Sequence, residues 1–105
     1  MWNKPTAKEL ARLPRLYETE DIAAKDKTIA MHFFFGSCDW YAVEFDGADT
    51  FFGFAVLNGD LQCAEWGYFS LTELDEINFT GFQVDRDLYW QPCPAGRIKR
   101  IKRWI

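Results

Sequence analysis

One histidine and three cysteines are the residues of this 105-residue chain best suited to nucleophilic catalysis. His32 and Cys38 lie close in sequence, Asp39 follows the cysteine, and a turn between them would bring the side chains together. A thiol beside an imidazole is the arrangement that activates a cysteine nucleophile. However, a single histidine among methionine and phenylalanine is more typical of a packed strand, and no nucleotide-binding, hydrolase or zinc-protease motif occurs. We therefore predict no catalytic residue and no enzyme activity.

Carboxylates gather around two expected turns. Glu44, Asp46 and Asp49 surround an Asp-Gly pair, and Asp60 follows an Asn-Gly pair. Such groups could hold a hard divalent cation or share a proton. Their spacing lacks the alternation of an EF-hand loop, and Asp-Gly is common in tight turns for conformational reasons alone. We expect solvated turn residues, with no metal and no cofactor.

Charge is distributed very unevenly along the chain. From Thr28 to Asp85 there is no lysine or arginine, whereas five basic residues occupy the last nine positions. The formal charge of −4 therefore combines a tail of +5 with a body of −9. A body without cations disfavours direct nucleic-acid binding, because phosphate binding depends on lysine and arginine displacing counterions. Nucleic acid could be reached only through the tail.

Length and composition indicate one folded domain. A composition of 49% hydrophobic and 18% aromatic residues is sufficient for a core. The odd number of cysteines, with no C-x-x-C pair, argues against a disulfide framework and a zinc ribbon and favours a reducing compartment. No apolar run reaches the length of a membrane span or a signal peptide. We expect a cytoplasmic protein without membrane contact.

Four aromatic and β-branched segments separated by turn residues predict a four-stranded antiparallel meander. They are TIAMHFFF, DWYAVEF, TFFGFAVL and LQCAEWGYF. A short helix is expected before the sheet, where Thr6 and Glu9 fit a capping box, and another after it, where Ser70 begins SLTELDEI. The predicted fold class is therefore α+β, with residues 1–96 as one domain and residues 97–105 as a basic amphipathic tail.

The tail, which ends in IKRIKRWI, has apolar residues at helical spacing and predicts a short basic helix. Three interpretations remain: the tail folds back on the acidic body, reaches a nucleic acid or anionic membrane, or contacts a second subunit and forms a homodimer. Folding back is the default because both charges belong to one chain. The candidate contact residues are Arg97, Lys99, Arg100, Lys102, Arg103 and Trp104.

Neither face of the predicted sheet is uniformly polar. Strict alternation places Trp40 and Glu44 on one face of the second strand and Phe45 on the other. Either the helices and tail cover both faces, or part of an aromatic face stays exposed for a partner. The candidate partner-binding residues are Trp40, Trp66, Tyr68, Glu44, Asp46, Asp49 and Asp60.

Several segments together resemble the small bacterial family catalogued as domain of unknown function 2958. They are LPRLYETEDI, EFDGADTFFGFAV, EWGYFSLTEL and DRDLYWQP, of which LYETE and GYFSLTEL are the most specific. The resemblance covers about Leu10 to Pro92 and excludes the basic tail. It implies a cytoplasmic α+β protein often encoded on plasmids, integrative elements and phages, and it implies no activity and no catalytic residues.

These observations lead to one expected function and one alternative. We expect a non-catalytic acidic protein from a mobile element that docks on a basic protein surface, as an inhibitor of a host defence complex of the restriction or CRISPR type. Charge complementarity of this kind favours rapid and specific association. The alternative, from a different class, is a nucleic-acid-associated accessory protein that binds through the tail.

Overall fold

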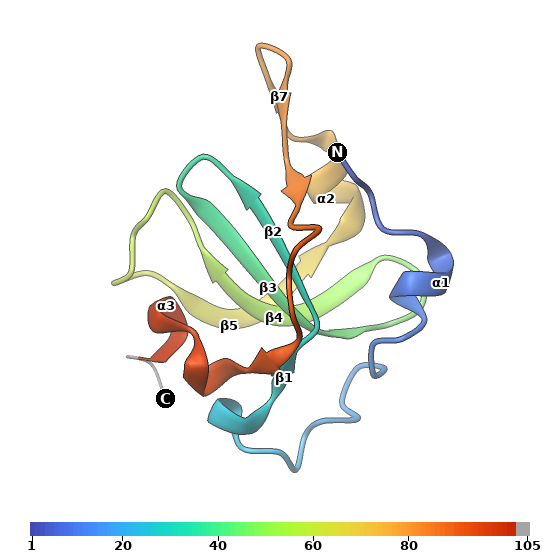
Figure 1. The fold of residues 1–105 in the computed structure, drawn as a ribbon, viewed down its shortest axis with the longest axis vertical. Helices are drawn as coiled ribbons and strands as arrows, with labels where there is room; N and C mark the ends of the chain where they lie inside the picture. Colours follow the sequence, from blue (N-terminus) through green and yellow to red (C-terminus); the bar gives the residue numbers. More distant parts are fainter. Residues whose placement is uncertain (103–105) are drawn as a thin grey trace.

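The computed structural model of the chain describes residues 1–102. A five-stranded antiparallel sheet of order β5-β4-β3-β2-β8 forms its centre (Figure 1). The strands are β2 (Met31–Phe35), β3 (Cys38–Phe45), β4 (Thr50–Val56), β5 (Glu65–Ser70) and β8 (Asp85–Arg86). The predicted α+β fold and its antiparallel meander are confirmed. The predicted number of four strands is wrong, because the short strand β8 adds to the sheet beside β2.

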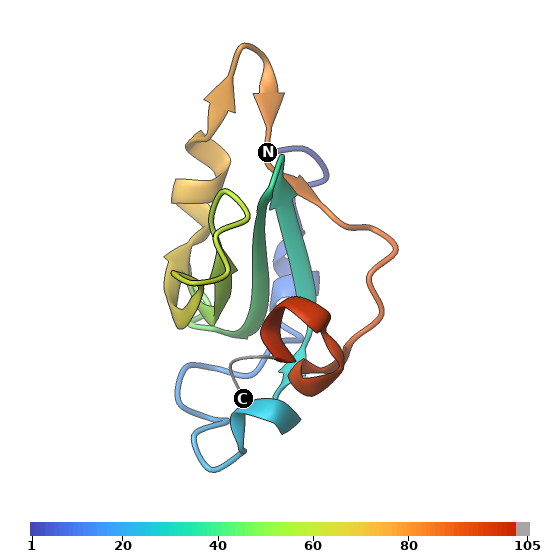
Figure 2. The ribbon, with the colours of Figure 1, turned by 90° about the vertical axis from the view of Figure 1, so that its left-hand side faces the viewer.

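Two small sheets flank the large one. The segment predicted as the first strand divides at Ala30, so that β1 (Thr28–Ile29) leaves the main sheet and pairs with β9 (Cys93–Pro94). Farther along the chain, β6 (Asn78–Phe79) pairs with β7 (Phe82–Gln83) in a hairpin. Figure 2 shows this hairpin projecting beyond the end of the main sheet.

The helices are short, and their capping side chains set where they begin. Thr6 and Glu9 form the predicted capping box of the first helix, with the Glu9 amide donating to Thr6 Oγ1 over 3.2 Å. Ser70 Oγ likewise accepts from the Glu73 amide at the start of the second. The α-helices are α1 (Ala7–Leu10), α2 (Leu71–Glu76) and α3 (Lys99–Lys102). The 3-10 helices are η1 (Ala24–Asp26) and η2 (Ala95–Arg97).

Both faces of the sheet are covered, each by a different part of the chain. On one face, Phe33 and Phe51 pack beneath side chains of the N-terminal segment and α2, including Leu10 and Leu74. The core on the other face includes Ile29, Tyr41, Val43, Phe54, Val56, Ala64, Ala95 and Ile101. The tail therefore supplies Ile98 and Ile101 to this core. Its residues 99–102 form the short helix α3, as the apolar spacing predicted.

A β-bulge in β3 changes the face to which its last residues belong. The register with β4 shifts between Ala42 and Glu44, so that Glu44 lies opposite Phe52 and Phe45 opposite Phe51. Strict alternation is therefore wrong at this end of the strand, because the extra residue of a bulge reverses the pattern. Opposite the bulge, a Cβ on Gly53 would lie 2.0 Å from the carbonyl oxygen of Tyr41, so only glycine fits there.

Candidate functional site

The hairpin of β6 and β7 exposes two phenylalanines. Phe79 and Phe82 lie opposite each other in the register, and their exposed fractions are 70% and 61%. Thr80 and Gly81 form the turn with φ angles of +53° and +91°, and the Asn78 side chain accepts a hydrogen bond from the Gly81 amide. Phenylalanine is normally removed from water on folding. Two exposed rings on one projecting hairpin therefore suggest an interaction surface.

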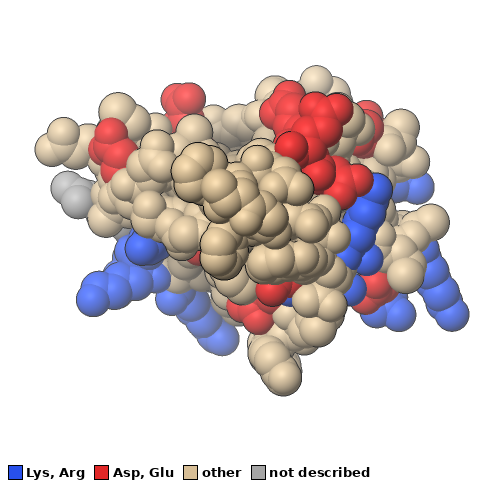
Figure 3. Space-filling view, turned by 90° about the horizontal axis from the view of Figure 1, so that it is seen from above, with Lys and Arg blue, Asp and Glu red and all other residues tan. Residues whose placement is uncertain are grey.

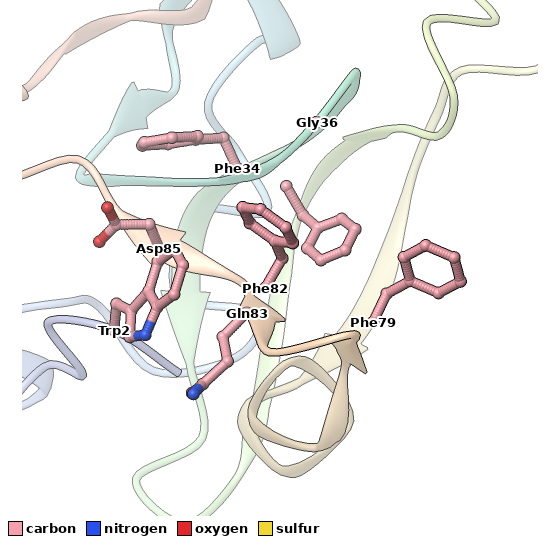
Figure 4. A pocket seen from close by; sticks show the side chains of 8 residues that line it. Trp2, Phe34, Gly36, Phe79, Phe82, Gln83 and Asp85 are labelled. Carbon is pink, nitrogen blue, oxygen red and sulfur yellow. The ribbon is translucent and has the colours of Figure 1, made fainter.

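The rings form one side of an apolar groove, shown in Figure 4, with a volume of about 380 Å³. Trp2 near the N-terminus supplies a further aromatic wall, and the rings of Trp2 and Phe82 meet edge to face at 6.5 Å. Phe34 on β2 borders the groove, although Figure 4 shows its ring pointing away from Phe79 and Phe82. The "aromatic groove" comprises Trp2, Phe34, Phe35, Gly36, Phe79, Phe82, Gln83 and Asp85. Its five aromatic residues come from three segments that are far apart in sequence, namely the N-terminus, β2 and the hairpin of β6 and β7.

The N-terminus fixes the position of Trp2. Its backbone pairs with β8, since the Trp2 amide donates to the Val84 carbonyl over 2.8 Å and the Trp2 carbonyl accepts from Arg86. The terminal ammonium donates to Asp75 on α2 and to Gln83 on the hairpin, at 2.8 and 2.7 Å. The hairpin, α2 and β8 are thus tied together at the groove.

Acidic side chains lie beside the uncharged hairpin. Asp85 lines the groove, and Glu73 and Glu76 are exposed on α2, the helix that leads directly into β6. Lys4 is paired with Asp75 at 2.8 Å, and this ion pair together with the N-terminal ammonium lowers the pKa of Asp75. Figure 3, seen from the hairpin end, shows an uncharged protrusion flanked by a group of acidic side chains, with most cations along the opposite edge.

Two of the residues predicted to bind a partner are buried. Trp40 is 6% exposed and packs in the core beneath α1 and α2. Glu44 is 3% exposed and accepts hydrogen bonds from the amides of Tyr17 and Thr19. Trp40 cannot contribute to a surface patch, so the prediction is wrong for this residue. Glu44 lines a pocket beside Tyr17 and Tyr68, and its role in binding a partner stays a prediction. Tyr68 is exposed and Trp66 half-buried on the face that carries the tail.

The remaining predicted acids all accept hydrogen bonds, Asp46 and Asp60 within their own turns and Asp49 from α2. Asp46 accepts from the amides of residues 48–50, and these hydrogen bonds lower its pKa. Asp49 Oδ1 accepts from both the amide and the hydroxyl of Thr72 in α2. Asp60 accepts from the Gln62 and Cys63 amides. These carboxylates therefore act as hydrogen-bond acceptors within the protein, although Asp46 and Asp60 are exposed. Their binding to a partner stays a prediction.

The described part of the tail, residues 97–102, contacts the body through the Arg100 ion pair and through the apolar side chains of Ile98 and Ile101. Arg100 Nη1 lies 2.7 Å from Asp39 Oδ2, and Ile101 is completely buried. Arg97, Lys99 and Lys102 are exposed, while Arg103 and Trp104 lie outside the described residues. These contacts correspond to the interpretation in which the tail folds back. Contact with a second subunit stays a prediction.

His32 is held by two carboxylates and does not meet Cys38. Its Nε2 lies 2.7 Å from Asp39 Oδ1, and its Nδ1 lies 3.2 Å from Asp87 Oδ2. The imidazole stacks on Tyr41 with 4.8 Å between ring centroids. Cys38 Sγ instead lies 3.7 Å from Asn58 Oδ1. With both ring nitrogens occupied, His32 is a packed strand residue that links the sheet, the β8–β9 segment and the Arg100 ion pair.

Among residues 1–102, no three histidine, cysteine or acidic side chains are grouped closely enough to hold a metal ion. No helix in this described part of the chain is both long and apolar enough to cross a membrane.

The comparison with protein families decides the membership of the chain. A model described as a protein of unknown function, DUF2958, matches residues 6–97. The chain belongs to this family. Comparison with curated proteins and with solved structures found no match. The match includes the hairpin and most of the groove, while Trp2 precedes it and α3 follows it.

The aromatic groove was not predicted from the sequence. The segment NFTGFQ does carry a hairpin signal, since a two-residue turn ending in glycine separates two phenylalanines. Thr80 weakens that signal, because β-branched residues rarely adopt a positive φ. The contribution of Trp2 depends on its pairing with β8 and has no local signal in the sequence.

Proposed function

We propose that this DUF2958 protein is a non-catalytic binding protein whose docking surface is the aromatic groove. The exposure of Phe79 and Phe82 on a projecting hairpin is the observation that supports this function best. Burying one phenylalanine side chain contributes about 1.5–3 kcal/mol. A partner that covered both rings would therefore gain a substantial part of the binding energy from the hairpin alone.

The proposed occupant is a segment of another protein that carries an apolar anchor side chain flanked by lysine or arginine. The apolar lining of the groove suits the anchor. Asp85 within the groove and the exposed Glu73 and Glu76 on α2 suit flanking cations. Charged groups at an interface rim increase the association rate and select among partners more than they increase affinity. Anchor and flanks thus have separate roles.

The identity of the partner is a broader proposal that depends on the family resemblance. Families carried on plasmids and phages often act against host defence, so the proposed partner is a host nucleic-acid-processing complex of the restriction or CRISPR type. Such proteins carry basic surfaces to bind phosphate, which suits the acidic flank of the groove. A cytoplasmic location follows from this proposal.

The nucleic-acid alternative keeps only part of its proposed surface. Arg100 is paired with Asp39, which leaves Arg97, Lys99 and Lys102 as exposed cations in the described part of the tail. Each phosphate contact contributes to the salt dependence of binding, so a gel shift with a shallow salt slope would be the expected result for this alternative.

A peptide-display selection on the full-length protein tests the proposed function. We expect enriched peptides with an aromatic or large aliphatic residue flanked by lysine or arginine. Phe82→Ser should weaken the binding of such a peptide at least about tenfold, because interface energy is concentrated in a few buried anchors. Tyr89→Ser is the matched control, since Tyr89 is 90% exposed and does not line the groove.

Two results would contradict the proposal. One is equal loss of peptide affinity in Phe82→Ser and Tyr89→Ser. The other is enrichment of peptides with no apolar anchor and no cation. Raising the salt concentration should slow association without removing the apolar contribution, because exposed charges are screened over about 8–10 Å near physiological ionic strength.

A further inference from the structure

A second pocket lies at the opposite end of β3 from the aromatic groove. It has a volume of about 280 Å³ and forms where the loop after α1 meets β4 and β5. The segments LYETE and GYFSLTEL, which are far apart in sequence, contribute to the same cavity. The "tyrosine pocket" comprises Tyr17, Glu20, Lys27, Glu44, Phe52 and Tyr68.

A buried carboxylate fixes the loop that carries Tyr17. Glu44 Oε1 accepts from the Tyr17 amide over 2.9 Å, and Oε2 accepts from the amide and the hydroxyl of Thr19. Tyr17 is held at a φ of +72°, a conformation that is uncommon for a side chain of this size, and its ring is 62% exposed. Unusual backbone conformations often occur at binding sites. The fold therefore supports an exposed tyrosine in a constrained position.

The rings and charges of the pocket suit a cation. Phe52 and Tyr68 approach at 5.4 Å with 60° between their ring planes, and so form a corner instead of a flat stack. A hydrogen bond with the Tyr17 side chain, followed by desolvation and by the charges of Tyr17, Glu44 and Glu20, raises the pKa of Tyr68. Aromatic rings together with carboxylates favour ammonium and guanidinium groups.

The basic side chain that lines the pocket, Lys27, is hydrogen-bonded to Thr19 and forms no ion pair with Glu20. Lys27 Nζ donates to the carbonyl and hydroxyl oxygens of Thr19, at 2.5 and 3.1 Å. Glu20 is exposed, and within residues 1–102 no cation lies within ion-pair distance of it. A carboxylate beside three aromatic rings is therefore available to an external cation.

We infer that the tyrosine pocket binds the side chain of an arginine or lysine presented by a partner protein. This inference rests on the proposed function in that the partner is basic, but the pocket and the aromatic groove are separate surfaces. Tyr68 and Phe52 supply the ring surfaces, Glu20 the countercharge, and Glu44 positions Tyr17 through the loop backbone. A partner that occupied both the tyrosine pocket and the aromatic groove would contact the protein at both ends of β3.

Nuclear magnetic resonance titration of the full chain with a short blocked peptide, Gly-Arg-Gly, tests the inference. A single side chain should bind with a dissociation constant on the order of 1 mM, or about −4 kcal/mol. The expected shifts are saturable and centred on the amides of Tyr17, Gly67 and Tyr68. The same peptide with citrulline in place of arginine, which lacks the charge, should bind at least about tenfold more weakly.

Matched variants separate the pocket from the rest of the surface. Tyr68→Ala and Glu20→Gln should each abolish the saturable shifts, and Glu20→Gln is the safer variant because its side chain is exposed. Tyr89→Ala should leave binding unchanged. Phe82→Ser should also leave it unchanged, so that failure of the tyrosine pocket and failure of the aromatic groove give different results.

Three outcomes would overturn the inference. They are the absence of saturable shifts up to about 20 mM peptide, a concentration well above the expected dissociation constant, equal binding of the citrulline peptide, and retention of binding in Glu20→Gln. Free arginine that bound at least about tenfold more tightly than the blocked peptide would assign the pocket to a small guanidinium ligand and overturn the assignment to a partner protein.

Discussion

Replacing Glu44 by glutamine tests whether one buried carboxylate holds the loop of residues 15–22 on the sheet. Glu44 receives one hydrogen bond from the Tyr17 amide and two from Thr19. Glutamine has nearly the same shape but only one acceptor oxygen. If that oxygen faces Thr19, the amide nitrogen must face the N–H of Tyr17, and two donors are brought together.

The expected cost follows from these contacts. Hydrogen bonds to a charged group contribute about 1.5–3 kcal/mol each, and a buried donor left without an acceptor costs about 1–3 kcal/mol. Local rearrangement of the loop would relieve part of this cost. We therefore expect Glu44→Gln to reduce the free energy of unfolding by about 2–3 kcal/mol. Glu20→Gln removes the same charge from an exposed position in the same pocket and should change it by less than about 0.5 kcal/mol.

Urea denaturation at neutral pH measures both free energies, and hydrogen exchange of the Tyr17 and Thr19 amides reports on the loop itself. Glu44→Gln should shift the urea midpoint and accelerate exchange at both amides. Equal stability of the two variants, with both amides still protected, would refute the assigned role of the carboxylate.

Three further substitutions test other parts of the structure. Gly53→Ala should destabilise by about 3 kcal/mol or more in thermal denaturation, because its Cβ would lie 2.0 Å from the Tyr41 carbonyl oxygen; unchanged stability would contradict the bulge geometry. Ile101→Ala should cost about 2–4 kcal/mol in urea, since Ile101 is completely buried; a cost below about 0.5 kcal/mol would show that the tail does not pack as described. Hydrogen bonding to Arg86 lowers the pKa of Glu9 to about 2. The contribution of Glu9 to the stability of the fold is therefore complete above the unfolded pKa of about 4.3 and is lost as pH falls towards 2. Glu9→Gln should flatten this part of an acid-unfolding curve, and an unchanged curve would contradict the ion pair.

Local sequence signals predicted the parts of the fold that depend on neighbouring residues. The caps at Thr6 and Ser70 act within one helical turn, and both form as expected. The strand segments were recognisable from their β-branched and aromatic residues. Asn58 and Gly59 both have positive φ, as the Asn-Gly signal indicated, although they lie in a longer loop between β4 and β5.

Features that depend on distant contacts could not be predicted in the same way. The bulge in β3 moves Glu44 to the face of Phe52, and nothing in the local pattern of DWYAVEF marks the extra residue. Trp40 was a candidate surface residue because the sequence left open whether the aromatic face of the sheet is covered, but side chains of α1 and α2 bury it. The aromatic groove requires Trp2 to pair with β8 near the other end of the chain.

Site-specific photo-crosslinking in host cells tests most directly whether the aromatic groove is the docking surface. A photoreactive phenylalanine analogue would replace Phe82 in one variant and Tyr89 in the other, since both side chains are exposed but only Phe82 lines the groove. We predict a discrete adduct from position 82 alone, with a protein whose linked segment contains an apolar residue flanked by lysine or arginine. The same adducts from both positions, or an adduct from position 89 alone, would contradict the account.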